Sequence, residues 1–143
     1  MIKAVLAGKH PDIPALKGEP KRKVIVFSEY ADTVSHLAAY LETYFAGRVV
    51  TVSGNTSKQL KLTVAANFDA GFGKKGKPQN LYDILVATDK MSEGHNLNRA
   101  GLVVNYDIPW NPTRVIQRVG RINRIGNKVF QNLYLFNFFP TIA

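Results

Sequence analysis

The chain has 143 residues, 45% of them hydrophobic and 20% charged, which is the composition of one globular domain with a sizeable core. The absence of cysteine excludes disulfides and thiolate metal sites, and the longest apolar runs are too short for a membrane span or a secretory signal. The net charge of +9, from 19 Lys and Arg against 10 Asp and Glu, favours a polyanionic partner such as nucleic acid. We therefore expect a cytoplasmic, prokaryotic nucleoid-associated protein ahead of a nuclear one.

The N-terminal segment and the rest of the chain differ in pattern. Residues 1–22 contain three prolines and little periodicity, which predicts a linker or arm that leads into a domain at 23–143. In this domain, short apolar runs rich in β-branched residues predict buried strands of a parallel sheet. These runs occupy residues 24–27, 49–52, 84–88, 102–106 and 130–136.

Helical periodicity fills three of the intervals between these runs. Amphipathic stretches or cap signals predict helices over 34–45, 57–68 and 112–121. Asp32 is the expected N-cap of the first, and Thr56 or Ser57 that of the second. Strands that alternate with helices across short loops indicate an α/β fold, with helices on both faces of a mostly parallel sheet.

The last predicted helix carries a dense basic cluster. Arg114, Arg118 and Arg121 are spaced i, i+4 and i+7, which puts three guanidinium groups on roughly one face, and Arg124 follows. No acidic residue occurs after Asp107, so the local sequence offers these arginines no partner. Two interpretations remain open: a solvated basic face, or a clamp for phosphate, which guanidinium binds through paired hydrogen bonds.

The same segment contains a recognisable motif. Gln117, Gly120, Arg121 and Arg124 form the pattern Q-x-x-G-R-x-x-R, which resembles motif VI of superfamily-two helicases. The resemblance implies a three-layer RecA-like domain of the P-loop-NTPase type. It also implies that Arg121 and Arg124 are arginine fingers that contact the γ-phosphate of ATP, with Gln117 as a further catalytic residue.

The residues around the motif resemble the SWI/SNF branch of these helicases. A Trp-Asn-Pro stands at 110–112, and an Ile-Gly-Asn stands at 125–127, where Asn127 replaces the usual glutamine. Glu93 occupies the position where DEAD-box helicases have arginine. This resemblance implies duplex DNA as the nucleic-acid partner.

Residues 84–98 resemble motif V of the same helicases and follow a predicted strand. A loop at the carboxyl end of a strand lies at the edge where open α/β sheets bind ligands. The resemblance implies that Thr88 bonds a nucleic-acid phosphate and that Gly94 and Asn96 approach the nucleotide. The alternative for Thr88 is a plain helix cap, but the 29-residue spacing to Gln117 favours the motif.

Two earlier segments complete the resemblance. Residues 23–30 resemble motif IV, and residues 53–71 resemble the segment after it, in which Phe68 is expected in the core. The resemblance implies contacts to the nucleic-acid backbone from Ser28, Ser53, Gly54 and Lys61. The Gly- and Lys-rich stretch at 71–80 predicts a flexible loop, whose lysines at 74, 75 and 77 are either solvated or a further nucleic-acid contact.

The chain lacks the other half of a helicase active site. It contains no G-x-x-x-x-G-K-[ST] loop for the phosphates and no Asp-Glu motif for the metal. We therefore expect no ATP hydrolysis by the chain alone. ATP would bind between this lobe and a first RecA-like lobe of the same parent chain, which would hold most of the Mg²⁺ contacts. The alternatives are a stand-alone nucleic-acid-binding module with a degenerate RecA-like fold, an RNA helicase lobe, or an unrelated α/β phosphate-binding domain.

Overall fold

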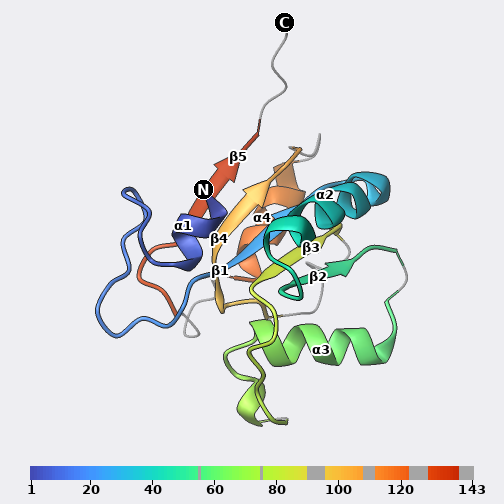
Figure 1. The fold of residues 1–143 in the computed structure, drawn as a ribbon. Helices are drawn as coiled ribbons and strands as arrows, with labels where there is room; N and C mark the ends of the chain where they lie inside the picture. The colour runs from blue at the N-terminus through green and yellow to red at the C-terminus, as the bar shows by residue number, and fades with distance from the viewer. Residues whose placement is uncertain (55, 75, 90–95, 108–111, 123–128, 139–143) are drawn as a thin grey trace, which may run out of the picture.

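The computed structural model describes residues 1–54, 56–74, 76–89, 96–107, 112–122 and 129–138. Within these residues the chain forms a five-stranded sheet in the order β2-β3-β1-β4-β5, in which every strand pair is parallel (Figure 1). The strands are β1 (Lys23–Phe27), β2 (Val49–Val52), β3 (Ile84–Ala87), β4 (Ala100–Asn105) and β5 (Tyr134–Asn137). The predicted α/β class with a parallel sheet is confirmed.

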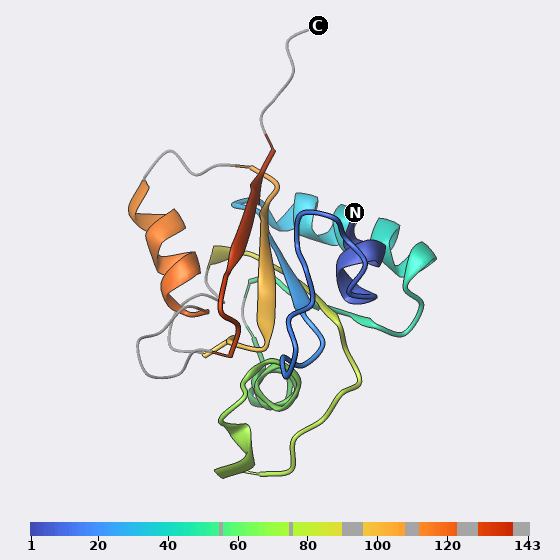
Figure 2. The ribbon, with the colours of Figure 1, turned by 90° about the vertical axis from the view of Figure 1, so that its left-hand side faces the viewer.

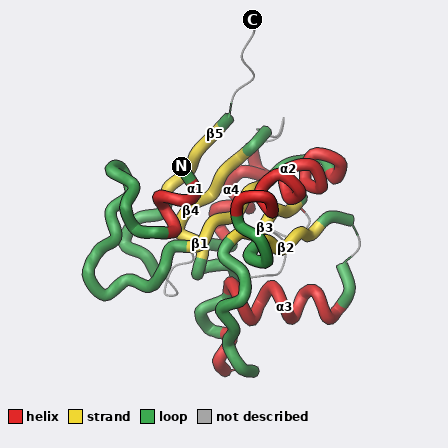
Figure 3. The backbone as a smooth tube through the Cα atoms, in the orientation of Figure 1, coloured by secondary structure: helices red, strands yellow, loops and turns green. Residues whose placement is uncertain are grey.

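Helices cover both faces of this sheet, which gives the predicted three layers (Figure 2). They are α1 (Ile2–Leu6), α2 (Ala31–Tyr44), α3 (Lys58–Phe68), the 3₁₀ turn η1 (Phe72–Lys74) and α4 (Pro112–Gly120). The helices α1 and α2 pack on one face, and α3 and α4 lie on the other (Figure 3). Among the residues given above, no helix is long and apolar enough to cross a bilayer.

The predicted caps are right for α3 and wrong for α2. The Ser57 hydroxyl caps α3 by accepting a hydrogen bond from the Leu60 amide at 3.1 Å. Helix α2 starts at Ala31 after an extended Tyr30, so Asp32 lies in its first turn and is not the N-cap. In that position the carboxylate still interacts favourably with the positive end of the helix dipole.

Two apolar cores hold the layers together. On the α2 face, Val34, Ala38 and Leu41 pack against the sheet, which confirms the predicted stripe. On the α3 face, Phe68 is fully buried, as predicted. The strands β1, β3 and β4 are buried along their whole length, which explains why their sequences are largely apolar and do not alternate with polar residues.

The N-terminal arm packs on the sheet. It contains α1, where the sequence predicted no regular structure, and Val5 and Ile13 are each 2% exposed in the core on the α2 face. One of these residues lies on a short helix and the other on a loop, so they share no period that would show in the sequence. The expectation of an arm without regular structure is corrected accordingly.

Strand β5 starts at Tyr134, and not at residue 130 as predicted. The Arg22 side chain contacts the residues that precede the strand. The Arg22 guanidinium donates to the carbonyls of Gly101 and Asn132, each at 2.8 Å, and lies 4.3 Å from the Phe130 ring centroid. The Arg22 side chain thus bonds the backbone just before β5 begins. A Cβ atom on residue 101 would come within 2.3 Å of Arg22 Cγ, so only glycine fits there.

The parallel arrangement gives the sheet two chemically different edges. Phe27 of β1 is paired with Ala87 of β3 and with Asn105 of β4, so the three strands end level with one another. We call the edge formed by the residues that follow the strands, at 28–30, 53–54, 88–89 and 106–107, the carboxyl edge. The opposite edge, formed by the residues at 21–23, 48, 83 and 99, is the amino edge.

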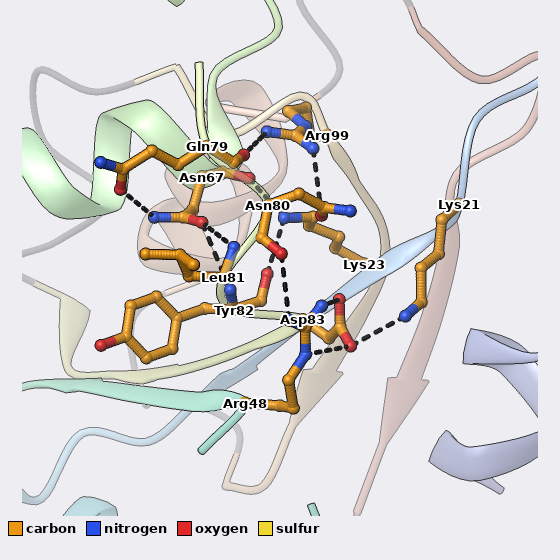
Figure 4. A network of polar contacts seen from close by, with 10 residues as sticks. All are labelled: Lys21, Lys23, Arg48, Asn67, Gln79, Asn80, Leu81, Tyr82, Asp83 and Arg99. Carbon is orange, nitrogen blue, oxygen red and sulfur yellow. Dashed lines mark hydrogen bonds and ion pairs between the residues drawn. The ribbon is translucent and has the colours of Figure 1, made fainter. Parts of the chain in front are cut away.

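A polar network closes the amino edge (Figure 4). The Asp83 carboxylate forms ion pairs with Arg48 and Lys21, each at 2.8 Å. Burial acts to raise the pKa of Asp83, but the hydrogen bonds from Arg48 and Lys21 outweigh it and hold that pKa below its usual value. The network ties the loop before β3 to the starts of β1 and β2.

Lys23 lies at the centre of this network and is 1% exposed. Its Nζ donates to the carbonyls of Asn67 and Tyr82, at 2.8 and 2.6 Å. Burial, together with the neighbouring charge of Arg99, lowers the pKa of Lys23 from 10.5 to about 7. The Lys23 amino group thus binds a carbonyl near the end of α3, and it loses its proton near neutral pH.

This pKa predicts that the chain becomes more stable as the pH rises from about 7 towards 10.5. In that window the unfolded lysine keeps its proton and the folded lysine loses it, so folding releases a proton and higher pH favours the folded state. The slope is at most about 1.4 kcal/mol per pH unit. Urea unfolding of the wild type and of Lys23→Met should be measured at several pH values between about 7 and 10.5. The free energy of unfolding of the wild type should rise with pH relative to that of Lys23→Met. Parallel pH profiles would contradict the prediction.

Candidate nucleic-acid and nucleotide sites

A pocket of about 380 Å³ opens at the carboxyl edge, between the ends of β1, β2 and β3 and the first turns of α4. Its lining includes Glu29, Gly54, Thr88, Asp89, Arg114 and Gln117. The fold therefore brings together Thr88 and Gly54, two residues predicted to contact nucleic acid from different strand ends. Gln117, predicted to act on the nucleotide, lies in the same pocket.

Arg118 lies beneath this pocket and is fully buried. Its guanidinium forms a forked ion pair with Asp89, in which Nη2 lies 2.9 Å from Oδ2 and Nε donates to Oδ1. It also donates to Asn105 Oδ1 at 2.9 Å and lies over the Phe27 ring. The interpretation of Arg118 as part of a solvated or phosphate-binding face is therefore wrong, because a carboxylate distant in sequence neutralises it.

Ser28, predicted to line the nucleic-acid path, is fully buried. Its hydroxyl donates to the Asp107 carboxylate, which also accepts a hydrogen bond from the Glu29 amide at 2.9 Å. A buried hydroxyl with this partner cannot reach a ligand at the surface. The placement corrects the predicted role: Ser28 joins the ends of β1 and β4.

Arg114 is the other arginine of α4 with a carboxylate partner. Its Nη1 lies 3.0 Å from Glu29 Oε1, with the two side chains 50% and 19% exposed. Arg114 and Gln117 lie on the side of α4 that faces the pocket. The helix thus has one buried arginine below the pocket and one exposed arginine at its rim.

The backbones of Leu97 and Arg121 meet at the other end of α4. The Leu97 amide donates to the Arg121 carbonyl at 2.9 Å, and β4 begins at Ala100, so this contact lies towards the amino edge. The end of the segment that resembles motif V therefore lies away from Arg114, since the rise of α4 puts Arg121 about 10 Å from Arg114 along the helix axis.

Asn96 and Arg121 both carry side-chain groups without a described partner. Asn96 Oδ1 is buried and accepts no hydrogen bond. Arg121 is half-buried, and no carboxylate of the described residues lies within ion-pair distance of it. A buried acceptor and a guanidinium without partners among the described residues are features expected of positions that bind a polar ligand.

The other predicted residues lie away from the pocket or outside the described part of the chain. Lys61 is exposed on α3, one turn after its start, and Ser53 is half-buried beside Gly54. Lys77 is exposed in the loop after η1. Outside the described residues lie Gly94 and Arg124, the side chains of Lys74 and Lys75, Glu93, and most of the segments at 110–112 and 125–127.

Sequence reasoning missed the carboxylates of the carboxyl edge, although a signal for them exists. Glu29, Asp89 and Asp107 each lie two residues after the end of a strand. Because β1, β3 and β4 are neighbours that end level with one another, these three side chains gather at one place. An acidic residue at the same offset after several buried strands would have predicted partners for the arginines of α4.

The protein matches a known family and several relatives. A family model described as the helicase conserved C-terminal domain matches residues 9–126. YqhH of Bacillus subtilis, described as an uncharacterized ATP-dependent helicase, is 34% identical over 121 residues, which are 80% of this chain and 18% of YqhH. The ATP-dependent RNA helicase dbp6 of Aspergillus niger is 34% identical over 110 residues, which are 74% of this chain and 17% of dbp6.

A third relative has a different description. The SNF2 domain-containing protein CLASSY 4 of Arabidopsis thaliana is 30% identical over 122 residues, which are 82% of this chain and 10% of CLASSY 4. The chain thus spans less than a fifth of each of these relatives.

A solved structure shares the fold. The crystal structure of the C-terminal part of the Fun30 ATPase domain matches with a TM-score of 0.69 at 18% identity, over 95% of this chain and 37% of that one. At this identity the likeness concerns the fold alone. The family match covers most of the chain and agrees with the observed architecture. The chain therefore belongs to the helicase conserved C-terminal domain family, as a second RecA-like lobe of the superfamily-two helicase fold.

Proposed function

We propose that the chain is the second motor lobe of a SWI/SNF-like protein that uses ATP to move along duplex DNA. The observation that carries this proposal is the pair formed by Arg121 and Asn96, which present a guanidinium and a buried amide oxygen without partners in the described chain. Asn96 precedes Leu97, whose amide donates to the Arg121 carbonyl, so the two residues are close along the backbone. A lobe that supplies arginine fingers needs such an unneutralised cation facing a nucleotide.

The residues at this place suit a nucleotide. Asn96 Oδ1 needs a hydrogen-bond donor, which a ribose hydroxyl or an adenine amino group provides. The Arg121 guanidinium suits phosphate oxygens, and by the resemblance Arg124 acts beside it while Gly94 lets the backbone approach the ligand. When bound, ATP supplies the phosphoanhydride bond whose hydrolysis drives movement, with Mg²⁺ held mainly by the first lobe. Gln117 is assigned to the nucleotide by the resemblance alone.

The carboxyl edge is the proposed nucleic-acid side of the lobe. Thr88 and Gly54 share the pocket there, and the predicted contacts Ser53 and Lys61 follow the same strand end. Contacts of this kind reach phosphates and not bases, so they give affinity without sequence preference and with strong salt dependence. We exclude Ser28 from direct contact because it is buried.

The choice of DNA over RNA rests on residues around the motifs. The Trp-Asn-Pro at 110–112 and Glu93 favour the SWI/SNF branch, and CLASSY 4 agrees with it by description. The RNA helicase dbp6 is 34% identical over its aligned residues, compared with 30% for CLASSY 4. An RNA helicase lobe is therefore the second candidate function.

ATP hydrolysis by the intact protein tests both candidates. We expect a DNA duplex to stimulate hydrolysis more strongly than an RNA duplex of the same sequence, and the stimulation to weaken as salt rises. Stimulation by RNA alone would favour the RNA helicase lobe. An intact protein that binds nucleic acid but hydrolyses no ATP would favour the stand-alone binding module and contradict the proposal.

A further inference from the structure

The described charged residues that line the carboxyl-edge pocket are all in ion pairs. Arg114 is bound to Glu29, and Arg118, below the floor, is bound to Asp89. Among the described residues that line the pocket, Arg114 is the single cation. Among these described residues, a phosphate placed beside Thr88 would therefore meet two carboxylates and no unpaired positive charge. For a described residue of the pocket to supply a cation to the phosphate, one ion pair has to open.

The two ion pairs differ in how easily they open. Arg118 is fully buried and makes two hydrogen bonds to Asp89. Separating a buried charge from its partner costs several kcal/mol, so this ion pair is hard to open. Arg114 is half exposed and makes one hydrogen bond to Glu29, and exposed pairs of this kind contribute little stability. Arg114 is therefore the cation that can turn towards a ligand without leaving a buried charge unpaired.

We propose that Arg114 is a phosphate ligand of this pocket and that Glu29 is a built-in competitor that occupies it when no nucleic acid is bound. The inference rests on the proposed function, because it takes a nucleic-acid phosphate as the ligand beside Thr88. The phosphate displaces the Glu29 carboxylate and pairs with both arms of the guanidinium. The Thr88 hydroxyl donates a second hydrogen bond to the same group.

The backbone of Glu29 keeps the competitor close after displacement. Its amide donates to Asp107 at 2.9 Å, and Asp107 is also held by the buried Ser28. The carboxylate therefore stays tethered within reach of Arg114 and returns when the phosphate leaves. This exchange lowers the affinity of a single contact and makes it quickly reversible, which suits a lobe that grips and releases a strand in each cycle.

Two charge variants of the intact protein measure the competition. Glu29→Gln removes the competing charge but keeps the size of the side chain, and we expect it to lower the half-activating concentration of a DNA duplex about two- to fivefold. Arg114→Gln removes the ligand, and we expect it to raise that concentration about tenfold. It should also reduce the slope of log affinity against log salt by about 1.

Matched controls separate this contact from net charge. Asp12→Asn and Lys9→Gln change the charge by the same amounts on exposed residues of the arm, on the sheet face away from α4, and should leave the affinity nearly unchanged. The decisive measurement is the double variant, in which Glu29→Gln should have no effect once Arg114 is glutamine.

Three results would count against these statements. An equal gain from Glu29→Gln in both backgrounds would overturn the proposal, since Glu29 would then act by simple repulsion of the nucleic acid. An unchanged affinity in Glu29→Gln would overturn it too. A wild-type protein without nucleic-acid-stimulated ATP hydrolysis would overturn the proposed function itself, which distinguishes the two failures.

Discussion

Replacing Arg121 by alanine in the intact protein is expected to lower kcat for ATP hydrolysis about 10³- to 10⁵-fold, the loss seen when an arginine finger is removed. This corresponds to about 4–7 kcal/mol of barrier. The physical reason is that the half-buried guanidinium has no carboxylate partner among the described residues, so it is available to a charge that develops on phosphate. Steady-state turnover with saturating nucleic acid measures the effect.

The same experiment needs variants that isolate the guanidinium. Arg121→Lys keeps the charge but loses the two-pronged geometry, so it should stay strongly impaired. Lys3→Ala, exposed on α1 across the sheet, should hydrolyse ATP like the wild type. The melting temperature of Arg121→Ala should be close to normal, because the side chain makes no ion pair with the described residues. Turnover within a few-fold of the wild type would refute the finger assignment.

Replacing Arg118 by alanine is expected to destabilise the chain by about 3 kcal/mol, at the lower end of the range for a broken buried ion pair. The change leaves the Asp89 carboxylate, 17% exposed, without its guanidinium and removes the donor to Asn105. The residual exposure of Asp89 keeps the loss at the lower end of the range. The free energy of unfolding in urea measures it.

Arg114→Ala provides a matched control on the same helix. It also breaks an arginine–carboxylate pair, but an exposed one, and should cost less than about 1 kcal/mol. Adding Asp89→Asn to Arg118→Ala should recover part of the loss, since the carboxylate charge that Arg118 neutralised is then removed as well. Equal losses for the two arginine variants would show that burial of Arg118 does not control the stability of this edge.

These two arginines show where sequence reasoning reached its limit. The i, i+4 and i+7 spacing of Arg114, Arg118 and Arg121 is correct along the helix, but it does not tell which partners face each side chain. Their partners, Glu29 and Asp89, follow strands that only the sheet order brings beside α4. Local spacing therefore predicted one basic face where the structure has a buried pair, an exposed pair and one half-buried cation.

For the predicted site residues too, the sequence indicated the positions in the chain, and the fold decided which of them lie together. Thr88 and Gly54 were predicted separately, and the parallel register brings them into one pocket. Asn96 was predicted in one motif with Thr88, yet its neighbour Leu97 bonds the backbone of Arg121 beyond the end of α4. Ser28 matched a motif position but points into the protein. Motif matching identifies positions in a chain, and the direction of a side chain depends on its neighbours in space.

By itself the sequence determined the strands, the main helices, the α/β class and the Arg121 motif, because each depends on a pattern within a short stretch of chain. Only the tertiary structure decided that the arm packs through Val5 and Ile13, that β5 starts late beside Arg22, and which charges are neutralised. Those outcomes depend on which strand ends are neighbours in the sheet. Burial removes water from some charges and leaves others hydrated, so the same residue type is structural at one position of α4 and available to a ligand at another.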